Sequence, residues 1–215
     1  MKQANISSKR CRSYKRTTRR NAAHPVAPNR LNQQFEATKP NQIWLTDITY
    51  IQTEQGWLYL AAVLDLFSRR ILSWSMDARM TETLTHKALE MAIASRPEMP
   101  DNLLHHSDQG SQYTSADYQA LLVQNNMLVS MSGVGNCYDN APMESFFSSL
   151  KTELVHHERY PSRREARTSI FDYIEVFYNR KRIQGAIAYM TPLAFEQRWQ
   201  RTASRMEGTP ALAMS

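Results

Sequence analysis

Cysteine and long apolar runs are scarce in this chain of 215 residues, and each scarcity excludes a class of protein. The two cysteines, Cys11 and Cys137, are too few for a disulfide framework or a cysteine-rich zinc site. The longest apolar stretch, residues 58–67, is short and interrupted by Asp65, so we expect no membrane span. The first residues are basic and polar and do not resemble a signal peptide. We therefore expect a cytoplasmic protein.

Acidic residues are almost missing from residues 1–40, which contain ten Lys or Arg and one Glu, a net charge of +9. Three prolines and little periodicity predict an extended or partly disordered arm. Such an arm suits a nucleic-acid partner, because each phosphate contact releases condensed counterions. A solvated tail is the plain alternative, and the two are compatible, since a tail can order on binding. The basic residues expected to contact nucleic acid are Lys9, Arg10, Arg12, Lys15, Arg16, Arg19 and Arg20.

The rest of the chain has enough apolar residues, 42% of the whole, to bury a core. Its hydrophobic patterns and turn residues predict a mixed α/β domain in which helices cover a five-stranded sheet. The expected strands are residues 43–52, 57–65, 70–77, 103–107 and 127–131, and the expected helices are 81–95, 115–124, 141–155 and 162–179. We divide the chain into a basic arm (1–40), a core with C-terminal helices (41–200) and a flexible tail (201–215).

Three acids stand at unusual places in these elements. Asp47 lies in the middle of the first strand, where a carboxylate is costly unless it is paired or binds a metal. Asp108 follows the fourth strand, where α/β sheets usually carry their sites. Glu144 lies in the first turn of a helix that Pro142 helps to begin. Each acid also has a plainer explanation when it is taken singly. Asp47 could be a salt-bridged structural residue, Asp108 part of an ordinary turn, and Glu144 a favourable charge at the start of a helix.

As a set, the three acids favour a site for divalent metal. Oxygen ligands without zinc-type neighbours suit Mg²⁺ or Mn²⁺. Two such ions can activate an attacking oxygen and stabilise a leaving one in phosphodiester chemistry. Lys151 lies on the same helix face as Glu144, pointing either at the substrate backbone or, as an ordinary helix lysine, into solvent.

These residues resemble the catalytic core of the DDE transposases and retroviral integrases. The likeness is to the transposase encoded by the second reading frame of two-frame bacterial insertion sequences in particular. Thirty-five residues separate Asp108 from Glu144, which fits the spacing of that superfamily. The matching segments are residues 44–50 (Trp44 to Tyr50), 65–70, 106–113, 135–151 and 177–180.

The resemblance implies a ribonuclease-H-like fold, with three antiparallel strands followed by two parallel ones. It implies that Asp47, Asp108 and Glu144 are catalytic and hold two Mg²⁺ ions, for which Mn²⁺ can substitute. It also implies that Lys151, Asn140 and Arg180 contact DNA. Two positions depart from the family pattern: Gln184 replaces a usual His, and Ala188 replaces a usual Gly.

The activity implied is metal-dependent cleavage and strand transfer at the ends of an insertion sequence. The expected partners are double-stranded DNA at element ends and target, further copies of the chain on that DNA, and an upstream-frame helix-turn-helix protein. One alternative is a truncated, non-catalytic DNA-binding product that regulates or inhibits transposition. Another is a ribonuclease-H-type nuclease, which the basic arm and the glycine loop at residues 132–140 disfavour.

Overall fold

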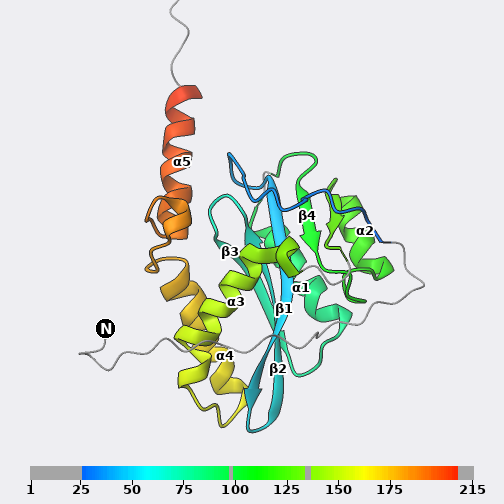
Figure 1. The fold of residues 1–215 in the computed structure, drawn as a ribbon, viewed down its shortest axis with the longest axis vertical. Helices are drawn as coiled ribbons and strands as arrows, with labels where there is room; N and C mark the ends of the chain where they lie inside the picture. The colour runs from blue at the N-terminus through cyan, green and yellow to red at the C-terminus, as the bar shows by residue number, and fades with distance from the viewer. Residues whose placement is uncertain (1–25, 97–98, 134–136, 208–215) are drawn as a thin grey trace, which may run out of the picture.

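The fold is built on one mixed sheet of five strands. The computed structural model describes residues 26–96, 99–133 and 137–207, so the arm residues predicted to bind DNA lie outside the described residues. The strands are β1 (Ile43–Thr53), β2 (Gly56–Asp65), β3 (Ile71–Asp77), β4 (Leu104–Ser107) and β5 (Leu128–Met131). They lie in the order β3-β2-β1-β4-β5 (Figure 1). The first three are antiparallel, whereas β4 runs parallel to β1 and β5 parallel to β4.

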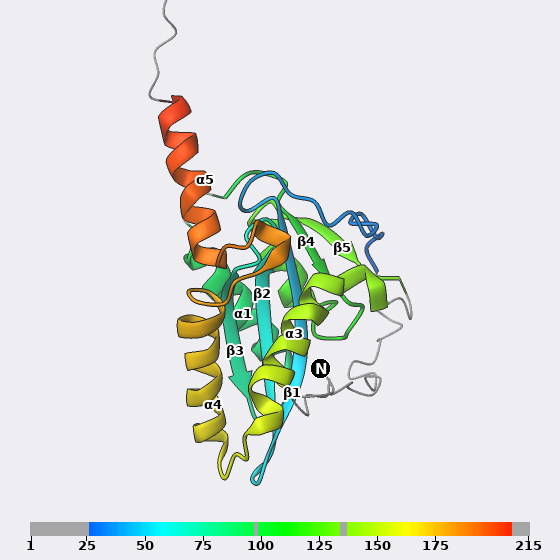
Figure 2. The ribbon, with the colours of Figure 1, turned by 60° about the vertical axis from the view of Figure 1, so that its left-hand side comes forward.

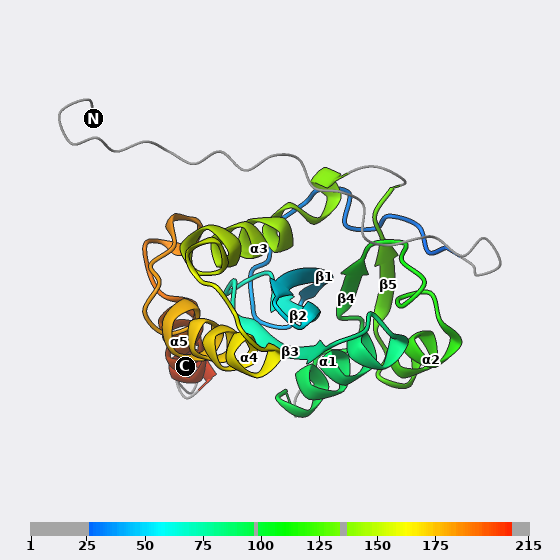
Figure 3. The ribbon, with the colours of Figure 1, turned by 90° about the horizontal axis from the view of Figure 1, so that it is seen from below.

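Helices cover both faces of the sheet, because β1 and β2 bury side chains on both sides. Leu45 and Ile51 belong to a core with α3 (Ala141–Glu153) and α4 (Arg163–Phe171). Trp44 and Ile48 belong to a second core with α1 (Glu82–Ala94) and α2 (Ala116–Gln124). Alternation of side chains along a strand places these two sets on opposite faces. Figure 3 shows α3 and α1 on opposite sides of β1 and β2.

Shorter elements complete the chain. A π-helical segment, Asp172–Tyr178, continues α4, and 3₁₀ turns form at Cys137–Asn140, Val155–His157 and Gly185–Ile187. The last helix, α5 (Pro192–Glu207), projects from the body of the molecule (Figures 1 and 2).

Two polar side chains hold the turns around β3 in place. The buried Asp65 accepts hydrogen bonds from the backbone N–H of Asn41 at 2.7 Å and of Ser68 at 2.9 Å. Asn179 pairs with the backbone of Ile71 in both directions, each bond 3.0 Å long. Asp65 and Asn179 belong to two of the segments that carry the family resemblance, residues 65–70 and 177–180. These hydrogen bonds give both side chains a structural role.

The sequence predictions for the sheet and its helices are confirmed. Their ends differ by one or two residues, except that the predicted helix 162–179 is α-helical over Arg163–Phe171 and π-helical over Asp172–Tyr178. α5 has no counterpart among the predicted helices, and it continues to Glu207, beyond the start of the predicted tail. The end of the predicted arm is packed against the core, because Leu31 is only 1% exposed. Among the described residues, no helix is both long and apolar enough to cross a membrane.

Candidate active site

Asp47 lies at the centre of β1, on the face that packs against α3. Its carboxylate accepts a hydrogen bond from the backbone N–H of Ile48 at 2.7 Å. Burial raises the pKa of Asp47 well above its ordinary value, and the negative charges of Asp108 and Glu144 raise it further. The positive charge of Lys151 acts in the opposite direction on the same pKa. The fold therefore brings Asp108, Glu144 and Lys151 within electrostatic reach of Asp47.

Asp108 comes directly after β4, beside Asp47. In the parallel pairing of β4 with β1, Leu45 lies opposite His106, and Asp47 and Asp108 each follow two residues later in the chain. The negative charge of Asp108 raises the pKa of Asp47, so the two carboxylates lie within electrostatic reach of each other. Asp108 shapes its own turn, since its Oδ1 accepts the N–H of Gly110 at 2.8 Å.

Glu144 and Lys151 come from α3, which packs against β1 on the face that carries Asp47. Glu144 is exposed in the first helical turn, and partial desolvation raises its pKa. Lys151 is only 9% exposed, and its Nζ lies 4.9 Å from the ring centroid of Tyr50. The interpretation of Lys151 as a solvated helix lysine is therefore wrong. Its contact with DNA stays a prediction.

The other predicted DNA-contacting residues differ in their surroundings. Asn140 is 6% exposed, and its amide donates a hydrogen bond to the carbonyl of Thr46 at 3.1 Å. In this structure Asn140 therefore ties the start of α3 to the strand position just before Asp47. Arg180 is exposed. The centre of the glycine loop, residues 134–136, and the arm residues 9–20 lie outside the described residues.

Tyr113 and Asp139 also belong to the site, although sequence reasoning gave neither a role. Tyr113 is fully buried, and its hydroxyl lies 3.4 Å from Thr46 Oγ1. Burial, and then the charges of Asp47 and Asp108, raise the pKa of Tyr113 well above its ordinary value, so it stays neutral beneath the acids. Asp139 is 1% exposed and lies in the 3₁₀ turn Cys137–Asn140, at the end of the glycine loop and directly before α3. The only sequence signal for either was its place inside a matching segment.

The site gathers three carboxylates, but it does not arrange them as a ready-made set of metal ligands. In the part of the chain that the structure describes, no group of three or more His, Cys, Asp or Glu side chains is arranged to hold a metal ion. The three carboxylates repel one another, as the raised pKa of Asp47 shows. A cation among them would offset both the burial and the repulsion. Carboxylate oxygens are the ligands that Mg²⁺ and Mn²⁺ prefer, so this donor set fits such an ion.

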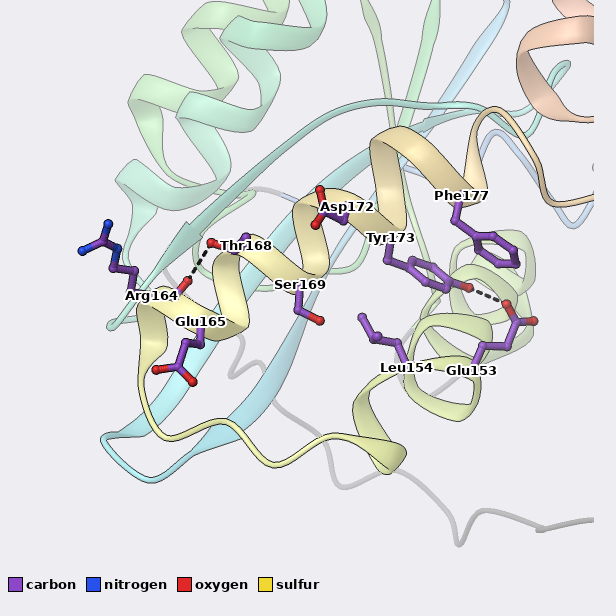
Figure 4. Close-up of a pocket in the computed structure, with 9 residues that line it drawn as sticks. All are labelled: Glu153, Leu154, Arg164, Glu165, Thr168, Ser169, Asp172, Tyr173 and Phe177. Carbon is purple, nitrogen blue, oxygen red and sulfur yellow. Dashed lines mark hydrogen bonds between the residues drawn. The ribbon is translucent and has the colours of Figure 1, made fainter.

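A separate hollow of about 970 Å³ lies between the end of α3 and α4 (Figure 4). Its lining includes Leu154, Tyr173 and Phe177, and the Tyr173 hydroxyl donates a hydrogen bond to Glu153 at 2.7 Å. None of the three acids of the candidate site lines it.

Comparison with known families identifies the architecture. Two models of the integrase core domain match the chain, one over residues 37–137 and the other over residues 144–199. The solved structures with a similar fold include the catalytic core of HTLV-2 integrase in complex with magnesium, with a TM-score of 0.56 at 18% identity. That match covers 75% of this chain and 99% of the integrase core. A simian T-cell lymphotropic virus intasome chain gives a TM-score of 0.60 at 19% identity, over 90% of this chain and 63% of that one. The fold is thus the ribonuclease-H-like fold of integrase catalytic cores.

Similar sequences come from bacterial insertion sequences. The 31 kDa protein of insertion element IS600 from Shigella sonnei is 47% identical over 94% of this chain and 74% of its own length. The transposase InsF of IS3A from Escherichia coli K12 is 46% identical over 92% of this chain and 68% of its own length. The chain therefore belongs to the integrase-core family of insertion-sequence transposases.

Proposed function

We propose that this chain is the catalytic core of a transposase that cleaves and joins DNA at the ends of an insertion sequence. The observation that carries the proposal is that Asp47 in β1 lies within electrostatic reach of Asp108, in the turn after β4, and of Glu144 in α3. Each of the two other acids raises the pKa of Asp47. A cluster of like charges that is partly withdrawn from water is costly for folding and is typical of a site that works on a charged substrate.

In this proposal Asp47, Asp108 and Glu144 hold two Mg²⁺ ions, or Mn²⁺ in their place. When bound, such ions activate the attacking oxygen and stabilise the leaving oxygen of a phosphodiester in line. The protein supplies the placement: β1 and the turn after β4 fix two carboxylates side by side, and α3 brings the third. Lys151 offsets part of their charge from its buried position, and we propose that it also contacts the DNA backbone.

The proposed partners follow from the same chemistry. Double-stranded DNA at the element ends and at the target supplies the phosphodiesters, and the basic arm at residues 1–40 supplies cations for its backbone. Joining two ends requires more than one active site on the DNA, so we propose that copies of the chain assemble there. One of the similar solved structures is a viral intasome.

Asp108→Asn tests the proposal. The substitution keeps the shape of the side chain and can keep its turn, but it removes a charged ligand. We expect strand transfer on labelled element-end DNA with Mn²⁺ to fall by more than the roughly 10–100-fold that loss of a supporting residue costs. DNA affinity should stay nearly unchanged.

Asp117→Asn, an exposed aspartate in the first turn of α2, is the matched control and should keep full activity. Equal strand transfer by Asp108→Asn and wild type would remove Asp108 from the site. Tight DNA binding by the wild-type chain without any turnover would favour the alternative, a non-catalytic DNA-binding regulator of transposition.

A further inference from the structure

A short segment far from the acids in sequence, residues 29–33, is fastened to the loop that leads into α3. We call this segment the strap. Its backbone N–H groups at Arg30 and Leu31 donate hydrogen bonds to Ser130 Oγ in β5, at 2.9 and 3.2 Å. The Leu31 side chain is buried in the core that contains α3. The strap therefore has a fixed position on the sheet edge beside the candidate site.

Asp139 joins the strap to the loop. Its Oδ2 accepts hydrogen bonds from the Asn29 side-chain amide at 2.9 Å and from the backbone N–H of Gly133 at 2.8 Å. Its Oδ1 accepts the Gln33 side-chain amide at 3.0 Å. Among the described residues, this buried carboxylate thus receives donors from two segments about a hundred residues apart. The strap and the loop before α3 are held by the same side chain.

Asn140, the residue after Asp139, links this loop to the strand that carries Asp47. Asn140 donates its amide to the carbonyl of Thr46, the neighbour of Asp47, and α3 begins at the following residue. Glu144 stands in the first turn of that helix. A shift of the Asp139 backbone would therefore move the start of α3 relative to β1, and with it the distance from Glu144 to Asp47.

Ser130, which binds the backbone of the strap, also contacts His106 in β4, the strand that precedes Asp108. Ser130 Oγ accepts two backbone N–H groups, so its own hydrogen is available for His106 Nδ1, 2.8 Å away. His106 then carries its hydrogen on Nε2, which lies 3.1 Å from Ser132 Oγ at the start of the loop. This chain of bonds ties the strap, β4 and the loop into one polar network.

We propose that Asp139 is a positioning residue, which uses the strap to fix the loop before α3 and thereby sets Glu144 against Asp47 and Asp108. The inference rests on the proposed function of the three acids. It assigns no contact with substrate to Asp139, whose carboxylate is directed at the strap and at Gly133. A residue that serves only fold stability would affect unfolding but not the turnover of the folded protein.

The network allows a test in which one substitution repairs another. Gln33→Glu sets a carboxylate against the carboxylate of Asp139, so the strap and loop should separate. In Asp139→Asn alone the amide oxygen still accepts from Asn29 and Gly133, and Gln33 can turn its own amide to accept the new N–H, so this variant should lose less turnover than Gln33→Glu. In the double variant the amide introduced at position 139 donates to the carboxylate introduced at position 33 and restores the bond. The matched control is Gln34→Glu, the same change at the next, exposed residue.

Turnover at saturating element-end DNA, with Mn²⁺, should fall about tenfold or more in Gln33→Glu, the range seen when a supporting residue is lost. It should stay near wild type in Gln34→Glu and recover in the double variant relative to Gln33→Glu, while DNA affinity changes little throughout. An equal loss in Gln34→Glu, or a double variant no better than Gln33→Glu, would overturn the proposal.

Hydrogen exchange without DNA or metal separates this inference from the proposed function. We expect Gln33→Glu to speed exchange of the backbone N–H of Gly133 and of those at the start of α3, and Asp139→Asn to reverse the effect. If this pattern appears while the wild-type chain fails to join DNA, the proposed function fails and the strap still positions Glu144. Unchanged exchange in Gln33→Glu would refute the positioning role whatever the activity.

Discussion

Asp47 is an expensive side chain to place in a central strand, because its charge is withdrawn from water and faces two further carboxylates. The chain offsets part of this cost with the N–H of Ile48 and the charge of Lys151. A residue retained for stability alone would be better served by an apolar side chain at this position. The cost at Asp47 therefore supports a functional role for the acids.

Ala188 has a strained backbone conformation, and no contact in the described structure accounts for the strain. It adopts the left-handed conformation, with φ 54° and ψ 37°, at the end of the 3₁₀ turn Gly185–Ile187. This conformation explains why a glycine is usual at that position in the family that the sequence resembles, because glycine has no Cβ to clash there.

We predict that Ala188→Gly stabilises the protein by about 1 kcal/mol, since it removes this strain from the folded state. Urea unfolding followed by circular dichroism measures the change. Ala186→Gly in the same turn, which is exposed and lacks a positive φ, is the control and should be mildly destabilising. A loss of stability in Ala188→Gly comparable to that of the control would contradict the strain argument.

At the scale of elements, α5 is held to the body by a buried carboxylate together with aromatic contacts. Glu196 is 1% exposed and forms ion pairs with Arg96 and, at 3.4 Å, with Arg70. Burial alone would raise the pKa of Glu196, but the hydrogen bond from Arg96 and the charges of Arg96 and Arg70 outweigh burial and lower it. On a neighbouring side of the helix, Phe195 and Trp199 pack against Phe67.

We predict that Glu196→Gln lowers the free energy of unfolding at pH 7 by about 3 kcal/mol, because it leaves buried arginine charge unpaired. A carboxylate with a lowered pKa stabilises the fold above its ordinary pKa of 4.5, and this stability is lost as pH falls through its folded pKa. The difference between variant and wild type should therefore be full at pH 7 and shrink below about pH 4.5.

Urea titrations at several pH values measure this difference. Glu158→Gln, at an exposed residue with no ion pair among the described residues, is the control and should behave like wild type. A difference between Glu196→Gln and wild type that stays constant down to pH 3 would show that the charge of Glu196 does not fasten α5.

The elements differ in how far the sequence predicts them. β1, β2 and β3 are encoded locally, by alternating apolar residues and by turns such as the one at Gly56, whose φ is +97°. Asp47, Asp108 and Glu144 could be singled out because each breaks a local pattern. The strap and the contacts of Asp139 could not, because their partners lie about a hundred residues away. α5 was missed although its sequence carries a helical apolar pattern and a proline at its start.

For the whole molecule, charge is divided between two regions with different roles. Residues 1–40 carry a net charge of +9, whereas the remaining 175 residues carry −3 and hold the three acids. A negative core does not attract DNA by itself, so the arm and a cation at the acids are the natural means of holding phosphate near them. The relatives from IS600 and IS3A extend beyond the part that this chain matches. DNA contacts by the arm stay a prediction.

The central claim is that Asp47, Asp108 and Glu144 form one cation site, and thermal unfolding with and without Mn²⁺ tests it most directly. At Mn²⁺ about 100-fold above its dissociation constant, binding to the folded state contributes about 2.7 kcal/mol. For a protein of this size, that should raise the melting temperature by roughly 5–10 °C. Asp47→Asn, Asp108→Asn and Glu144→Gln should each lose most of this shift, whereas Asp117→Asn keeps it. A full Mn²⁺ shift in any one of the three variants would contradict the account.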